Sequence, residues 1–127
     1  MTLRGILIPA DLDQPIRVVD VGDCRGIAKA VAAQYVERVR CVLTHDLNLT
    51  LAVDEEGWFR DHPLVNSRAR MLYPGALVGD VLVLRESFAG GGMDWVDLAE
   101  GAQAEEVEGI LGAALSLVEA FASPWSS

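Results

Sequence analysis

The feature that most constrains the fold is a strictly alternating segment near the middle of the chain. Large aliphatic side chains alternate there with smaller or polar ones, in the order Leu47, Asn48, Leu49, Thr50, Leu51, Ala52 and Val53. Successive side chains of a β-strand point to opposite faces, so this pattern predicts a strand in a sheet with one buried and one solvent-facing side. Residues 38–43 are expected to form its neighbour, with a turn at His45–Asp46 between them.

Other segments predict further strands and a short helix. Residues 3–8 and 15–21 are rich in β-branched and aliphatic side chains and form a predicted hairpin, and the aliphatic run 81–86 predicts another strand. A short helix is expected to begin after the N-cap Asp23 and to end near Gln34, because its apolar residues recur at helical spacing.

A second short helix is expected over residues 67–73. Asn66 stands directly before it, and an asparagine side chain at this place accepts a hydrogen bond from a backbone N–H of the first turn. Pro74–Gly75 ends the helix, since proline cannot continue it. Residues 58–65 are interpreted as a strand fragment and a loop, and Gly90–Gly92 as part of a flexible loop.

The strongest helical pattern lies at the end of the chain. Residues 104–122 place these apolar side chains on one helical face: Val107, Ile110, Leu111, Ala114, Leu115, Val118 and Phe121. The sequence therefore predicts one α+β domain over residues 1–127, in which a mixed or antiparallel sheet carries two short helices and a C-terminal amphipathic helix. Residues 101–122 form that acidic helix, and residues 123–127 are expected to be a frayed tail.

The charge of the chain is strongly negative and unevenly distributed. The chain has 10 Lys and Arg against 19 Asp and Glu, a formal net charge of −9, and residues 86–127 contain eight acidic and no basic side chains. Such a single-sign segment points to a binding partner, and it disfavours nucleic acid because phosphate contacts need clustered Lys or Arg. The apolar runs are too short for a membrane span and no secretory leader is recognisable, so a cytoplasmic location is expected.

No catalytic or metal-binding constellation can be assembled from the residue types present. Each reactive side chain has an ordinary structural interpretation: His45 and His62 in turns, Cys24 at a helix start and Cys41 on a strand. The chain is therefore expected to be non-enzymatic and to need no cofactor or metal. Trp58, Phe59 and Trp95 are interpreted as core residues, with an exposed recognition patch as the alternative.

Three stretches in combination resemble a known family. They are the N-terminal segments 5–9 and 16–21, the acidic turn in 53–64, and the stretch VNSRARMLYPGALVGDVLVL. Together they are similar to a domain of unknown function found in small proteins of bacteriophages, plasmids and actinobacteria. The likeness covers roughly residues 3–100, so residues 1–100 are interpreted as a family-like core.

The resemblance carries some expectations about residues and biology. Asn66, Ala69, Gly79 and Asp80 match the family pattern and are interpreted as determinants of the fold. The resemblance implies a mobile-element accessory protein of the host cytoplasm, acting in host modulation or counter-defence.

Two functions are expected from these observations. The first is binding of a host protein through an acidic and apolar surface near the C-terminal helix, formed by Asp97, Glu100, Glu105, Glu106 and Glu108. The alternative is binding of a small anion or nucleotide, because guanidinium groups and the N–H groups of a helix start both attract anions. Its residues are Asn66, Arg68, Arg70 and the loop Gly90–Gly92. A homodimer through the helix or an open strand edge is compatible with either function.

Overall fold

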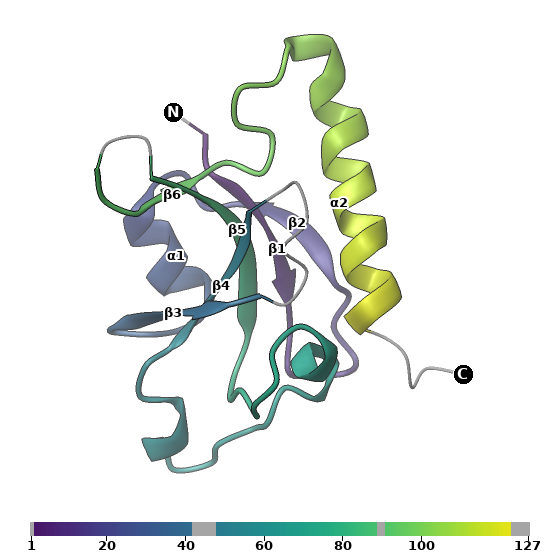
Figure 1. Cartoon of the computed structure of the whole chain (residues 1–127). Coiled ribbons are helices and arrows are strands. Elements are labelled where there is room, and N and C mark those ends of the chain that lie inside the picture. Colours follow the sequence, from purple (N-terminus) through teal and green to yellow (C-terminus); the bar gives the residue numbers. More distant parts are fainter. Residues whose placement is uncertain (1, 42–47, 89–90, 123–127) are drawn as a thin grey trace.

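The protein is a single sheet with helices on both faces, seen in a computed structural model that describes residues 2–41, 48–88 and 91–122 (Figure 1). The strands are β1 (Arg4–Ile8), β2 (Arg17–Asp20), β3 (Val36–Arg40), β4 (Leu49–Asp54), β5 (Val81–Ser87) and β6 (Asp94–Val96). The helices are α1 (Cys24–Ala30) and α2 (Val107–Ala122), with 3₁₀ turns η1 (Gly57–Phe59), η2 (Ser67–Met71) and η3 (Ala104–Glu106). The predicted α+β class is thus confirmed.

All pairs of named strands in the sheet are antiparallel, and their spatial order is β2-β1-β5-β4-β3 with β6 also paired to β5. The predicted hairpin is the β1–β2 pair, and the predicted pairing of the alternating segment with the strand before it is the β3–β4 pair. β1 and β6 share one side of β5, where β1 pairs with Val81–Val83 and β6 with Arg85–Ser87. Within the described residues, β2 and β3 are the outer strands of the sheet.

One face of the sheet packs against α2 and η2. Ile6 of β1, Leu51 of β4 and Val83 of β5 belong to the same buried cluster as the inward side of α2. That side consists of Leu111, Ala114, Val118 and Ala122. The predicted packing of the C-terminal helix on the sheet is therefore confirmed.

The opposite face packs against α1. Leu7, Leu82 and Leu84 form a second buried cluster with Ile27 and Val31 from α1 and its C-cap. This second layer overturns the expectation of a solvent-facing side on β4. The positions between its large aliphatic residues are covered as well, since Thr50 is 1% and Ala52 0% exposed.

Both helices differ in detail from their sequence patterns. α1 ends at Ala30, before the predicted Gln34, because the chain turns at Ala32, whose φ is +54°. Phe121 was expected on the buried face of α2 but is 39% exposed, whereas the smaller Ala122 beside it is buried.

Two other segments also depart from expectation. Residues 58–65 do not contain a strand fragment: they form the end of η1 and turns, with an isolated bridge from Val65 to Val78. Residues 94–96, for which the sequence predicted no element, form the short strand β6. The predicted turn at His45–Asp46, Gly90 and the tail 123–127 lie outside the described residues.

Candidate binding surfaces

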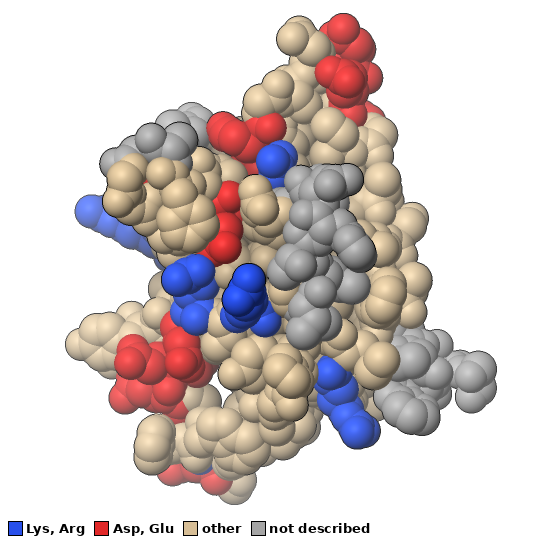
Figure 2. All heavy atoms as spheres, viewed as in Figure 1, with Lys and Arg blue, Asp and Glu red and all other residues tan. Residues whose placement is uncertain are grey.

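The acidic side chains at the start of α2 are exposed and have a structural role there. Glu105 and Glu106 belong to η3 and Glu108 to the first turn of α2, and Figure 2 shows acidic side chains gathered at the top of the molecule, over the start of this helix. Glu106 Oε1 accepts a hydrogen bond from the backbone N–H of Gln103 at 3.2 Å, which satisfies a donor before the helix begins. Carboxylates at this end of a helix also interact favourably with its dipole.

Asp97 was grouped with these acids, but it lies inside an ion pair. It is 8% exposed, and its carboxylate accepts hydrogen bonds from the backbone N–H, Nε and a terminal guanidinium nitrogen of Arg4 at 2.6, 3.0 and 2.8 Å. The N–H of Ala99 donates a further bond at 3.1 Å. The acidic surface is therefore reduced to Glu100 and the three glutamates at the start of α2, since Glu100 is exposed.

The same contacts set the ionisation of Asp97. Burial acts to raise the pKa of its carboxyl, but the hydrogen bonds from Arg4 and Ala99 and the positive charge of Arg4 outweigh burial, so the pKa lies below its ordinary value. The hydrogen bond to Asp97 in turn raises the pKa of Arg4. This pair joins the end of β6 to the beginning of β1, where the N–H of Leu98 also donates to Arg4 O.

Asn66 is the N-cap of η2, as the sequence predicts. Its Oδ1 accepts from the N–H of Ala69 at 3.2 Å, and its amide nitrogen donates to Ile8 O at 2.8 Å and Gly79 O at 3.0 Å. The side chain is 1% exposed. Asn66 therefore ties η2 to β1 and to the turn before β5, and its polar atoms face the protein interior.

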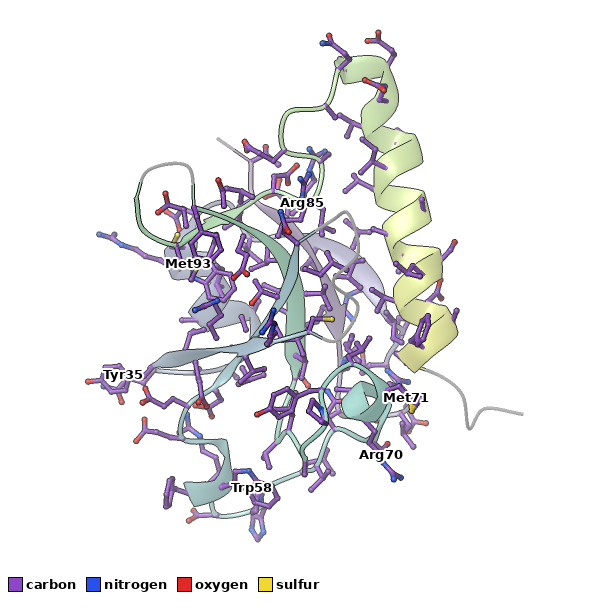
Figure 3. All side chains as sticks on the ribbon, in the orientation of Figure 1. Tyr35, Trp58, Arg70, Met71, Arg85 and Met93 are labelled. Atoms are coloured by element: carbon purple, nitrogen blue, oxygen red, sulfur yellow. The ribbon has the colours of Figure 1, made fainter. Side chains whose placement is uncertain are left out.

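The arginines of the predicted anion site are not brought together around an open pocket. Arg68 donates to three backbone carbonyls of the β1–β2 connection: Gln14 O at 2.7 Å, Leu12 O at 2.6 Å and Pro9 O at 3.3 Å. Arg70 is exposed on η2 (Figure 3), and Figure 1 shows the loop before β6, which contains Gly91 and Gly92, at the other end of the molecule.

The reactive side chains occupy separate places. Cys41 is fully buried in the core, as predicted, whereas Cys24 is exposed and lines a hollow of about 550 Å³ with Met93 and Trp95. His62 is exposed. Across residues 2–41, 48–88 and 91–122, no group of His, Cys, Asp and Glu side chains is arranged to hold a metal ion.

No helix in this same part of the chain is long and apolar enough to cross a membrane.

Three aromatic side chains are exposed together at one end of the sheet. Tyr35 directly precedes β3 and is 57% exposed, and Trp58 and Phe59 of η1 are 57% and 86% exposed. Figure 3 shows Tyr35 and Trp58 at the same end of the molecule, away from α2. We call these three residues the aromatic end. Of the aromatic residues assigned to the core from sequence, only Trp95 is partly buried, against the α1 side of the sheet.

The turn η1, which carries Trp58 and Phe59, is held in place by contacts within the domain. Asp54, the last residue of β4, accepts from the N–H of Glu56 at 3.0 Å and pairs with Nε of Arg60 at 2.8 Å, so its carboxylate spans η1. Gly57 is buried against Val78, where an added Cβ would lie 3.1 Å from the Cβ of Val78. These contacts hold the backbone of η1 to the domain and leave its large side chains on the outside.

Acidic side chains surround the aromatic end. Glu55 and Glu56 line one shallow hollow with Tyr35 and Phe59. A second hollow, of about 200 Å³, lies beside β3 and is lined by Glu37, Val39, Glu55, Trp58, Tyr73 and Leu77 among others. Figure 2 shows this group of acidic side chains at the lower left, between β3 and η1. No described residue forms an ion pair with Glu37, Glu55 or Glu56.

Comparison with known proteins supports the fold alone. No family model matches the chain, and no curated protein matches its sequence. A solved structure with a similar fold is the crystal structure of the small RNA methyltransferase HEN1, with a TM-score of 0.60 and 12% sequence identity. The similarity covers 87% of this chain but 16% of that one, so the present chain corresponds to a small part of the larger protein.

Proposed function

We propose that the protein is a non-enzymatic binding module that recognises a partner protein through the aromatic end. The observation that carries this proposal is the exposure of Trp58 and Phe59 on a turn held by Asp54, and of Tyr35 directly before the neighbouring strand β3. Aromatic side chains contribute most to protein–protein interfaces, where they are enriched and form the residues whose loss costs most affinity.

The aromatic end is a better candidate than the acidic start of α2. The apolar side of α2 is already packed on the sheet, and its acids accept a backbone hydrogen bond and complement the helix dipole. The aromatic end has no such internal use: a side chain such as Phe59, at 86% exposure, leaves apolar surface in water with no intramolecular gain. A partner that covers it would recover that free energy.

The charge around the aromatic end favours a basic partner. Glu37 and Glu55 are exposed beside Tyr35 and Trp58, and the net charge of the chain is −9. Complementary charges at the rim of an interface speed association and exclude partners of like charge. If the chain comes from a bacteriophage or another mobile element, as its sequence resemblance implies, the partner is a host protein and the site of action is the host cytoplasm.

The experiment is affinity capture with three immobilised proteins from nuclease-treated actinobacterial lysate. The wild type is compared with the double variant Trp58→Ser/Phe59→Ser and with the triple variant Glu105→Gln/Glu106→Gln/Glu108→Gln. A captured protein is identified by mass spectrometry and its binding is repeated with purified components at two salt concentrations. The triple variant is the matched control, because it removes exposed charge while keeping the aromatic end.

If the proposal is correct, the wild type and the triple variant both capture the same basic protein, and the aromatic variant does not. Binding should weaken as salt rises, because part of the attraction is between exposed charges. Retention by the aromatic variant together with loss by the triple variant would place the site on α2 and overturn the proposal.

A further inference from the structure

Resting on the proposed function, we infer that the partner binds as an extended segment that adds a strand to the outer edge of β3. The segment alternates basic residues with β-branched or small apolar ones. Its basic side chains lie on the side of the sheet that carries Trp58 and Glu37. This mode of binding uses backbone hydrogen bonds for affinity and alternate side chains for specificity.

The hydrogen-bond pattern of β3 shows which backbone groups are available. The N–H of Glu55 donates to Tyr35 O at 3.0 Å, so Tyr35 and Glu55 are a hydrogen-bonded pair of the β3–β4 ladder. Because such pairs alternate along an antiparallel ladder, Glu37 and Val39 also bond toward β4. The N–H and C=O groups that point to the outer edge therefore belong to Val36, Arg38 and Arg40. No strand in the described part of the chain pairs with that edge.

The side chains beside this edge suit a long basic residue. A strand added to β3 would lie about 4.8 Å away, with every second side chain next to Glu37 or Val39. Trp58 and Tyr73 line the hollow on this same side, and Glu55 stands at its rim. An arginine in that position places its aliphatic stem on the apolar wall, its guanidinium over an indole ring and its charge near carboxylates.

The other side of β3 is compatible with neutral side chains. Arg38 pairs with Glu86 of β5 at 2.7 Å, so it already has an acidic partner within the domain and needs none from the added strand. Val36 packs partly against the cluster under α1 and leaves an apolar neighbour for a β-branched residue of the partner. The two sides of β3 therefore favour different residues in the added strand: basic residues beside Glu37 and Val39, and neutral residues beside Val36 and Arg38. This difference gives the alternating pattern.

A second copy of the chain is a poor occupant of this edge. Antiparallel pairing of two β3 strands about a two-fold axis gives three short registers. Glu37 faces Glu37 in the first, Arg38 faces Arg38 in the second, and Arg38 faces Arg40 in the third. Like charges directly opposite one another destabilise strand pairing. Charged edge residues of this kind prevent self-association while leaving the backbone groups open to a complementary strand.

The test uses the full ¹⁵N-labelled chain and a defined peptide probe. The probe is an acetylated heptapeptide in which three arginines alternate with two valines, with a threonine at each end. Its matched control is the same peptide with its five central amides N-methylated, which keeps the charge and side chains but removes the N–H donors of the three arginines and two valines. Affinity is measured by NMR titration, and amide hydrogen exchange is followed at Val36, Arg38 and Arg40.

Two protein variants separate the backbone from the side chain. Arg38→Pro removes one outward N–H at an edge position where proline is tolerated, and Arg38→Ala removes the same ion pair with Glu86 but keeps the N–H. Thermal unfolding shows whether each variant is folded. Should Arg38→Pro fail to fold, the methylated peptide still tests the inference on the wild type.

The inference expects slower exchange at the three outward amides in the complex. Methylation of the peptide and Arg38→Pro should each weaken binding at least roughly tenfold, while Arg38→Ala stays near wild type. Equal binding of both peptides, no binding, or protection confined to other amides would overturn strand addition. Strand addition by the peptide would also be overturned if protection of these amides rose with protein concentration in the absence of peptide. Loss of the captured partner by Trp58→Ser/Phe59→Ser but not by Arg38→Pro would leave the proposed surface intact and reject only this mode of binding.

Discussion

Replacing Asp97 by asparagine should destabilise the protein strongly, although the substitution removes no apolar core side chain and leaves the aromatic end unchanged. The carboxylate accepts four hydrogen bonds, three from Arg4 and one from Ala99, and the residue is 8% exposed. Removing one member of a buried ion pair costs about 3–5 kcal/mol. The Arg4 side chain is 25% exposed, so water recovers part of that loss. We expect Asp97→Asn to lower the free energy of unfolding by about 3 kcal/mol at pH 7.

The pH dependence of that loss gives a second, independent check. Because the pKa of Asp97 is lower in the folded chain, its stabilising contribution is complete above its pKa in the unfolded chain. The contribution disappears as the pH falls through the folded value. Urea unfolding of wild type and variant should therefore differ by a constant amount between about pH 5 and pH 8, and the difference should shrink below about pH 4.

Glu100 provides the matched control for this prediction. It is an exposed carboxylate three residues away, so Glu100→Gln should change stability by at most about 0.5 kcal/mol at any pH in this range. A loss below about 1 kcal/mol for Asp97→Asn, or a loss that stays the same at pH 3, would refute the assignment of Asp97 as the joint between β6 and β1.

Three other substitutions test the local structure by urea or thermal unfolding. Ala32→Gly should stabilise the chain by about 1 kcal/mol, because Ala32 follows the C-cap of α1 with a φ of +54°, where glycine has no Cβ penalty; a loss of stability would contradict this. Asn66→Ala should cost about 3 kcal/mol, because the carbonyls of Ile8 and Gly79 and the N–H of Ala69 lose a buried partner, and a neutral result would mean that water replaces the amide. Phe59→Ser should leave stability within about 0.5 kcal/mol, and a larger loss would show that the ring is needed for the fold.

Local patterns identified most elements of the fold correctly. The alternating segment became β4, the hairpin became β1 and β2, and the N-caps Asp23 and Asn66 make the predicted hydrogen bonds. Each of these depends on residues within a few positions of one another, where steric preference and capping act directly. In these segments the local preference and the tertiary packing favour the same structure, so the predicted elements form.

The differences arise where distant segments decide the outcome. Thr50 and Ala52 were expected on a solvent-facing side, yet both are buried, Ala52 in the cluster beneath α1, and no property of β4 indicates that second layer. Asp97 looks like a surface acid until β6 places it beside Arg4, 93 residues earlier in the chain. The pairing of β6 with β5 likewise depends on a partner strand that a short segment cannot reveal by itself.

For Trp58 and Phe59 the preferred interpretation, burial in the core, was wrong for a related reason, and the alternative of an exposed patch agrees with the structure. Trp58 and Phe59 have side chains that usually lie in cores, so composition favours burial. Their exposure follows from a three-residue turn whose backbone is held by Asp54 and by the close approach of Gly57 to Val78. The sequence signal that points to such a place is two adjacent aromatic residues directly after an acidic turn, with no alternation to carry them inward.

The measurement that tests the central claim most directly is the dissociation constant of the captured partner for three purified proteins: wild type, Trp58→Ser/Phe59→Ser and Glu105→Gln/Glu106→Gln/Glu108→Gln. Titration calorimetry at two salt concentrations supplies it, with thermal unfolding to show that all three are folded. Recognition by the aromatic end predicts that the aromatic variant binds at least roughly tenfold more weakly, because exposed aromatic anchors dominate interface energies, and that the triple variant binds like wild type. Unchanged affinity of the aromatic variant would contradict the claim and move the binding surface elsewhere on the domain.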